Sequence, residues 1–150
     1  MGCLFCEIVK GTIPSHRIWE DDKHLAFLSI FPNTKGFTVV VTKDHHPSYA
    51  FALPDQVLSD LVLAAKQVAQ RLDSKFESVG RTGLIFEGFG VDHSHCKLIP
   101  MHGTANMAEF KAINSAVPKY FEQYEGYLSS HDYQRADDAE LAELANYLGS

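Results

Sequence analysis

The sequence predicts an α+β fold with an antiparallel sheet of about five strands, one long helix and a shorter one. Three observations support this class. Three short strand-like runs separated by turn residues lie between residues 17 and 42, one long segment has helical spacing, and two further strand-like runs follow it. Strands joined by short turns pair antiparallel, because a parallel pair needs a long crossover between its strands.

The first part of the chain contains three expected strands. Gly11–Ser15 carries a glycine and a proline and predicts a turn. Two short strands are expected at Arg17–Glu20 and His24–Leu28, and a loop at Pro32–Gly36. Phe37–Thr42 is the strongest strand of the chain, because its β-branched residues favour extended backbone.

One long helix is expected to begin at Pro54, since proline suits the first helical position, and to end near Lys75. Apolar residues recur there at intervals of three and four, which places them on one face of a helix. They are Val57, Leu61, Ala64, Ala65, Val68 and Leu72.

The rest of the chain predicts two strands and several weaker elements. Strands are expected at Gly83–Phe86 and Cys96–Ile99, with a turn at Gly88–Gly90 between them. Further along, the sequence predicts a short helix at Ala108–Ala116, an extra strand at Tyr124–Ser129 and a C-terminal helix at Asp137–Leu148 with an acidic first turn.

Composition narrows the class of protein. A chain of 150 residues favours one domain, and its net charge of −6 argues against a broad nucleic-acid-binding face. The sequence contains no apolar run near the roughly 20 residues of a membrane span, and its beginning lacks a secretory signal pattern. Three cysteines, an odd number, fit poorly with a disulfide framework. We therefore expect a cytoplasmic protein with reduced thiols.

The most informative stretch is Asp92–Pro100, where His93, His95 and Lys97 stand at every second position. In extended backbone, alternate side chains share a face, and these three would lie roughly 6–7 Å apart along it. Two imidazoles and an ammonium in a row can supply a nucleophile, a proton donor and a positive charge. Such a row suits chemistry on phosphate groups. The alternative for Lys97 is a solvent-facing lysine at a strand end.

Cys3 and Cys6 form a Cys-x-x-Cys pair near the start of the chain. The pair suits zinc, redox chemistry or two small buried thiols. A thioredoxin-type role expects it inside a βαβ unit, which this position does not offer. A zinc site needs two further ligands, and a zinc finger would keep them much closer than the 39 residues that separate Cys6 from His45. The candidate ligands are His45, His46, His93 and His102.

Several segments, in order, resemble the N-terminal half of the histidine triad (HIT) family. They are Cys3–Val9, Ile13–Pro14, Trp19–Asp22, Ala26–Leu28, Gly36–Val40 and Lys43–His45. His93–Pro100 is similar to the signature of that family, His-x-His-x-His followed by apolar residues. The resemblance runs from about Cys3 to Pro100 and does not cover the last 50 residues.

The resemblance implies a HIT-like fold, with a HIT-like domain over residues 1–118 and a C-terminal extension over 119–150 packed on the same domain. It implies a homodimer that acts on nucleotides at the α-phosphate. The expected activity is that of a nucleotide phosphoramidase or nucleotidyl hydrolase, with a phosphoramidate or a dinucleoside polyphosphate as substrate. The ligand would be a purine nucleotide or a related phosphate ester rather than a nucleic acid polymer.

The same resemblance assigns roles to individual residues. The middle signature histidine, His95, would be the nucleophile and form a covalent nucleotidyl-histidine, with His93 and Lys97 at the two other signature positions. Many bacterial members hold zinc with a ligand set that corresponds here to Cys3, Cys6, His45 and His93. A bound zinc would be structural and would brace the strand that carries His95.

The chain departs from the family pattern at several substrate positions. Lys97 replaces the third histidine, and Ser29 stands where an aspartate usually binds the ribose hydroxyls. Gly88-Phe89-Gly90-Val91 replaces Gly-Gln-Ser/Thr-Val, so Gly90 lacks the hydroxyl that contacts phosphate. The predicted substrate-binding residues are Phe27, Ser29, Phe86, Gly88 and Gly90, with Phe86 near a position that is often asparagine.

Two other functions remain compatible with the sequence. The altered nucleotide contacts suit a non-catalytic nucleotide- or phosphate-binding protein that keeps the same scaffold. The acidic tail from Asp132 to Ser150 suits a partner-binding role, although a helix docked on its own domain or on a dimer mate is the preferred explanation of the tail.

Overall fold

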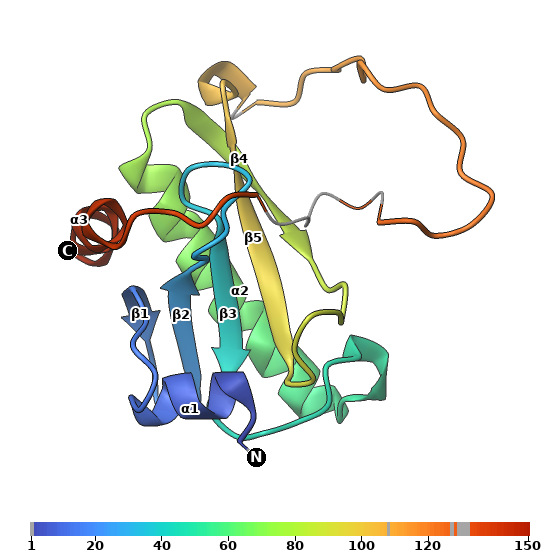
Figure 1. The fold of residues 1–150 in the computed structure, drawn as a ribbon. Helices are drawn as coiled ribbons and strands as arrows, with labels where there is room; N and C mark the ends of the chain where they lie inside the picture. Colours follow the sequence, from blue (N-terminus) through green and yellow to red (C-terminus); the bar gives the residue numbers. More distant parts are fainter. Residues whose placement is uncertain (1, 108, 127, 129–132) are drawn as a thin grey trace.

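The computed structural model describes residues 2–107, 109–126, 128 and 133–150 and contains an antiparallel sheet of five strands (Figure 1). The strand order is β1-β2-β3-β5-β4, so the expected α+β class is confirmed. The strands are β1 (Arg17–Glu20), β2 (His24–Leu28), β3 (Thr38–Thr42), β4 (Val79–Ile85) and β5 (His95–His102). The helices are α1 (Leu4–Lys10), α2 (Asp55–Lys75) and α3 (Asp138–Gly149), with 3₁₀ turns at Ala50–Ala52 and Ala105–Met107.

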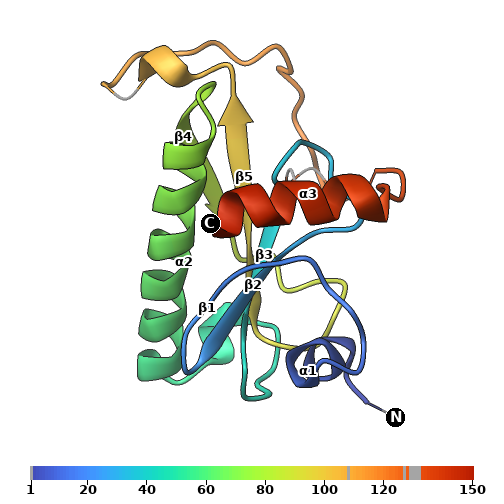
Figure 2. The ribbon, with the colours of Figure 1, turned by 90° about the vertical axis from the view of Figure 1, so that its left-hand side faces the viewer.

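Helices cover both faces of the sheet, with α2 on one side and α1 on the other (Figure 2). The central strands β2 and β3 are therefore buried along their whole length. Alternate residues of β2 point to opposite faces of the sheet. Ala26 and Leu28 pack under α2, whereas Leu25 and Phe27 face α1. The continuous apolar runs of these two strands follow from this two-sided burial.

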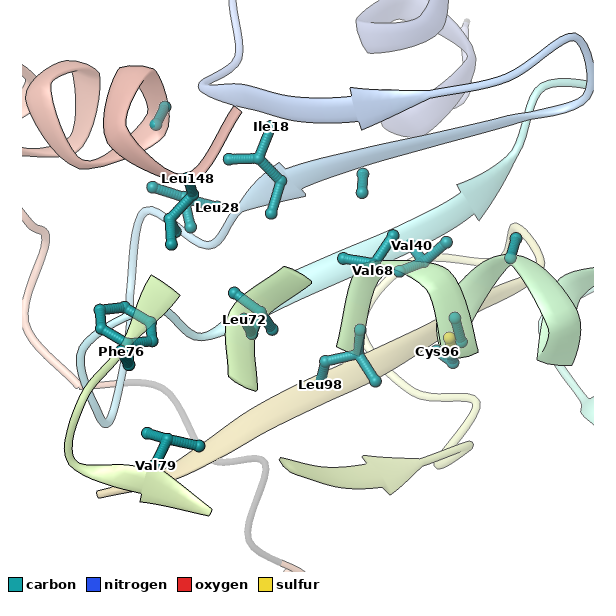
Figure 3. Packing of buried hydrophobic residues seen from close by; sticks show 14 of the residues in the cluster. Ile18, Leu28, Val40, Val68, Leu72, Phe76, Val79, Cys96, Leu98 and Leu148 are labelled. Atoms are coloured by element: carbon teal, nitrogen blue, oxygen red, sulfur yellow. The ribbon is translucent and has the colours of Figure 1, made fainter. Parts of the chain in front are cut away.

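The larger hydrophobic cluster lies between α2 and the sheet (Figure 3). Val68 and Leu72 of α2 pack with Val40, Cys96 and Leu98 of the strands. The C-terminal helix α3 joins the same cluster through Leu141, Ala145 and Leu148. The predicted long helix is confirmed, and its apolar face is the one that the three- and four-residue spacing indicates.

The short helix α1 lies on the opposite face and was not expected from the sequence. Phe5 and Ile8 of this helix pack with Leu25, Phe27, Val39 and Val41. The helix ends at Gly11, whose φ of 85° is the left-handed conformation that glycine favours at a helix end. Its seven residues are too few to show helical periodicity, and packing on the sheet stabilises it.

Strands β4 and β5 are longer than the sequence predicts. β4 begins at Val79, and an irregular pairing with β5 separates Val79 from Thr82. β5 continues through Pro100 although proline lacks the N–H that a central strand uses. The β3 pairing with β5 ends at Leu98, so Pro100 has a strand on one side only and its missing donor costs no ladder bond.

The segment after β5 contradicts two predictions. Residues 109–116 are described and contain no helix, so the helix expected at Ala108–Ala116 is wrong for that part, and Ala108 lies outside the described residues. The strand expected at Tyr124–Ser129 is absent from residues 124–126 and 128, and the other two residues are not described. Side chains such as Phe110 and Tyr120 are exposed, so these positions lack the packing that stabilises short elements.

The predicted C-terminal helix is confirmed as α3. Asp137 caps it by accepting a hydrogen bond from the Glu140 N–H, and Arg71 of α2 donates to the Leu148 carbonyl. The division of the chain at residue 118 stays a prediction. Within the described ranges, none of the helices has both the length and the apolar character needed to cross a bilayer.

The core predicts a stability contrast within α2. Leu72 is fully buried, whereas Leu63 on the same helix is 57% exposed. We expect Leu72→Ala to lower the free energy of unfolding by about 2–5 kcal/mol, because it removes packed methyl groups and leaves a cavity. Leu63→Ala is the matched control and should change it by less than about 0.5 kcal/mol. Urea unfolding of both variants measures the difference, and equal losses would contradict this packing.

Candidate active site and metal site

His95 and Lys97 lie on the face of β5 that points toward α1. They pair with Val41 and Val39 of β3, which belong to the cluster beneath that helix, and both line one cavity. Cys96 and Leu98 point to the other face, toward α2. The alternation predicted from the sequence is confirmed, except that His93 lies in the turn before β5 rather than on the strand.

The His95 ring is held in one orientation. It is 3% exposed, its Nδ1 lies 2.6 Å from the His93 carbonyl oxygen, and the Phe5 ring stands edge-on at 5.1 Å between centroids. A carbonyl only accepts, so Nδ1 carries the proton and donates it. The neutral ring then keeps a lone pair on Nε2, which forms no hydrogen bond with any residue that the structure describes.

Electrostatics favour the neutral form of His95. Burial is the largest cause that lowers the pKa of His95, and the nearby Lys97 ammonium lowers it further. The hydrogen bond to the His93 carbonyl and the Glu87 carboxylate act in the opposite direction without cancelling these effects. A neutral imidazole with an open Nε2 can act as a nucleophile.

His93 is fixed by a second imidazole–carbonyl hydrogen bond. Its Nε2 lies 2.7 Å from the Thr42 carbonyl oxygen at the end of β3, so Nε2 donates and Nδ1 carries the lone pair. That Nδ1 lies 3.4 Å from the Cys3 Sγ and 3.5 Å from the Cys6 Sγ. Burial lowers the pKa of His93, which favours the neutral ring that a metal ligand requires.

Cys3, Cys6, His45 and His93 form a group that could hold a metal ion. Their ligand atoms all lie within 4.8 Å of one another. The sulfur–nitrogen distances of 3.4–3.5 Å fit the edge of about 3.6 Å that tetrahedral zinc bonds to sulfur and nitrogen produce. Of the other histidines considered from the sequence, His102 is engaged elsewhere, with Ser78 and the Lys35 carbonyl, and His46 is not part of the group.

A cavity of about 340 Å³ opens beside His95, within the roughly 300–1,000 Å³ of small-molecule sites. Of the predicted site residues, Phe27, Ser29, Gly90, His95 and Lys97 line it. Mostly apolar side chains from α1, the neighbouring strands and the loops between them complete the lining. The described residues that line a larger hollow of about 530 Å³ beside α3 include neither histidine nor cysteine, so the smaller cavity is the candidate active site.

Two predicted substrate-binding residues lie away from the lining of this cavity. Phe86 packs against the hydrophobic cluster beneath α2. Gly88 is in the loop after β4, where its carbonyl accepts a hydrogen bond from the Ser48 hydroxyl. The structure therefore groups Phe27, Ser29 and Gly90 with His95, but not Phe86 or Gly88.

The ion-pair partner of Lys97 was not found from the sequence. The Lys97 Nζ lies 3.2 Å from the Glu87 Oε1, and their side chains are only 16% and 9% exposed. Ile85 pairs with Lys97 across the β4–β5 ladder, and Glu87 follows two residues later. A correct hairpin register would have indicated this neighbour, since residues two apart point to the same side of extended backbone.

Comparison with known proteins identifies the family. The family model of the HIT domain matches residues 10–134. The chain belongs to the HIT family. Protein hit of Bacillus subtilis is 34% identical over 106 residues, covering 68% of this chain and 72% of that relative. The adenosine 5′-monophosphoramidase of Schizosaccharomyces pombe is 36% identical over 101 residues, covering 67% of this chain and 74% of that enzyme.

Solved HIT structures share the fold. A Zn-bound histidine triad family protein from Mycobacterium smegmatis superimposes with a TM-score of 0.68 at 21% identity, covering 99% of this chain and 91% of that one. The likeness extends over nearly the whole chain, including the C-terminal residues beyond the stretch that resembles the family in sequence. The fold expected from the sequence is thus the fold of known HIT proteins.

The cysteine environments predict selective reactivity. Burial raises the pKa of the Cys96 thiol to about 12. Partial desolvation also raises the pKa of Cys6, but Cys3 and Cys6 are only half-buried and remain accessible. We expect iodoacetamide at about pH 8 to modify Cys3 and Cys6 in metal-free folded protein and to leave Cys96 intact, because only accessible thiolates react. Peptide mass spectrometry measures the labelling. Modification of Cys96 before unfolding would contradict the structure.

Proposed function

We propose that this HIT protein is a nucleotide phosphoramidase or nucleotidyl hydrolase that acts at the α-phosphate through a nucleotidyl-histidine on His95. The observation that carries the proposal is the hydrogen bond from His95 Nδ1 to the His93 carbonyl, which leaves the lone pair on Nε2 of a ring that lines a cavity of ligand size. Family membership and the similarity to an adenosine 5′-monophosphoramidase support the substrate class. A purine nucleotide, as a phosphoramidate or a dinucleoside polyphosphate, is the proposed ligand.

The reaction proceeds in two displacements at phosphorus. In the first, His95 Nε2 forms a bond to phosphorus while the bond to the leaving nitrogen or oxygen breaks, and the leaving group takes up a proton. In the second, water attacks phosphorus, the bond to His95 breaks, and the nucleoside monophosphate departs. The water gives up a proton, which balances the one taken up earlier, and His95 returns to its neutral form.

Other residues of the cavity have distinct proposed roles. Lys97 places a positive charge near the phosphate oxygens, where it stabilises charge that develops during displacement. His93 positions His95 through its backbone carbonyl. Phe27 supplies an apolar wall, and Ser29 and the backbone at Gly90 supply polar contacts to the nucleotide.

We further propose that Cys3, Cys6, His45 and His93 hold a structural zinc ion, as the donor set and its spacing favour. Four protein ligands close the coordination shell, so a bound zinc ties α1 to the turn before β5 rather than taking part in the reaction. We also propose that the chain works as a cytoplasmic homodimer, which the family resemblance implies.

Replacement of the proposed nucleophile gives the first functional test. We expect His95→Ala to lower kcat for adenosine 5′-phosphoramidate by at least about 1,000-fold, because His95 is the one imidazole among the described residues that line the cavity. Released adenosine monophosphate, measured by chromatography, reports the rate. His102→Ala, on the same strand but outside the cavity, is the control and should remain active.

The same assay separates the catalytic proposal from its alternative. Wild-type turnover that survives in His95→Ala would contradict the nucleophile assignment. Tight binding of adenosine monophosphate by a wild-type chain without turnover would instead establish the non-catalytic binding function. Circular dichroism of each variant shows whether a loss of turnover reflects a loss of folding.

The metal site predicts a stoichiometry. We expect about one zinc per chain in purified protein and a loss of most of it in Cys6→Ser, because three ligands of unchanged geometry bind zinc more weakly than four. Cys96→Ser is the control, since this thiol lies on the opposite face of the sheet. Elemental analysis measures the metal. Wild-type zinc content in Cys6→Ser would contradict the assigned ligand set.

A further inference from the structure

His93, His95 and Lys97 stand at alternate positions, and His93 belongs to the metal-ligand group. The ion pair between Lys97 and Glu87 lies at the other end of this series. Both side chains are mostly shielded from solvent, with 16% of Lys97 and 9% of Glu87 exposed. Removing two charges from water is costly unless they pair closely, as these do at 3.2 Å. The pair lies beside the proposed nucleophile, since both members act electrostatically on His95.

A tyrosine from the C-terminal segment engages the same carboxylate. The Tyr124 hydroxyl donates to the Glu87 Oε2, while Lys97 donates to Oε1, so the two oxygens of one carboxylate join two distant parts of the chain. The Tyr124 ring also stacks on Phe89, with 5.8 Å between centroids and 15° between planes. Phe89 itself lines the cavity beside His95.

The geometry of Lys97 leaves room for a phosphate. Its ammonium has three N–H donors, and among the described residues Glu87 is its one hydrogen-bond partner. A lysine side chain is long and flexible, so a lone ammonium would sample many positions around the cavity. Attachment to Glu87 restricts the ammonium to one region of the wall, with donors left for an anionic ligand.

We propose that Glu87 is a positioning residue that holds the Lys97 ammonium against the substrate phosphate, and that Tyr124 holds Glu87 in turn. This inference rests on the proposed nucleotide site and extends it. Lys97, at the third signature position, can then bind the phosphate effectively only when Glu87 is present. Without the Glu87 carboxylate, the Lys97 ammonium is poorly positioned. The C-terminal segment thereby contributes to the site through Tyr124.

A double-mutant cycle with two ligands tests the inference. Glu87→Gln and Lys97→Met are made singly and together, and calorimetry measures the affinities for adenosine 5′-monophosphate and for adenosine. We expect Glu87→Gln to weaken binding of the monophosphate by about 10- to 100-fold, by analogy with the loss that follows when a group that orients a metal ligand is removed. Binding of adenosine should change by less than about twofold, since Lys97 contacts the phosphate. Glu77→Gln, an exposed carboxylate, is the matched control.

The cycle decides whether Glu87 acts through Lys97. We expect Glu87→Gln to change monophosphate affinity by less than about twofold when Lys97 is already methionine, because interacting residues are not additive. Equal effects in the two backgrounds, equal losses for both ligands, or no effect at all would each overturn the proposal. A wild-type chain that binds neither ligand would overturn the nucleotide site itself and this inference with it.

Tyr124 has its own test, which leaves the charges of Lys97 and Glu87 in place. Tyr124→Phe removes the hydroxyl and keeps the ring that stacks on Phe89. We expect Tyr124→Phe to lower monophosphate affinity by about threefold or more, because it removes one hydrogen bond to a charged group. In the Glu87→Gln background, Tyr124→Phe should cause no further loss. Tyr120→Phe, at a ring 86% exposed, is the control. Wild-type affinity in Tyr124→Phe would remove Tyr124 from the proposal.

Discussion

Two imidazole–carbonyl hydrogen bonds at His93 are the constraint on which the candidate site depends. The side chain of His93 donates to the Thr42 carbonyl, and its own carbonyl accepts from His95. The first bond directs the lone pair of His93 toward two thiols, and the second leaves Nε2 of His95 available to the cavity. One residue thus orients both the metal-ligand group and the proposed nucleophile. A change in the metal-ligand group is therefore expected to alter the orientation of His95, and the reverse, through the backbone between His93 and His95.

The sheet is covered by helices on both faces, and this packing holds the two hydrogen bonds at His93 in place. Strands β2 and β3 are buried by α2 on one face and by α1 on the other, so β5 is held beside them in a fixed register. Period-two alternation then places His95 and Lys97 on the face toward α1, while Cys96 belongs to the core. His95 is itself almost fully buried, so nearby charges act on it more strongly than they would in bulk solvent.

Local patterns in the sequence predict the parts of this structure that local forces determine. The strands around residues 24–28 and 38–42, the long helix and the capped C-terminal helix follow from composition, periodicity and end signals. The helix α1 could not be predicted, because seven residues form a helix only when packed on the sheet. Glu87 was missed since its contact with Lys97 depends on hairpin register. Family resemblance selected the four members of the metal-ligand group, and the structure brings them together. The catalytic and substrate-binding roles of the site residues stay predictions.

The central claim is that His95 bonds covalently to the α-phosphorus of a nucleotide. The most direct measurement is peptide mass spectrometry of the wild-type chain, mixed with adenosine 5′-phosphoramidate, denatured within milliseconds and kept at alkaline pH, where phosphorus–nitrogen bonds to histidine survive. The account predicts an adenylyl group on His95, formed and lost at rates consistent with turnover. Turnover without any adduct on this residue, or an adduct confined to another residue, would contradict it.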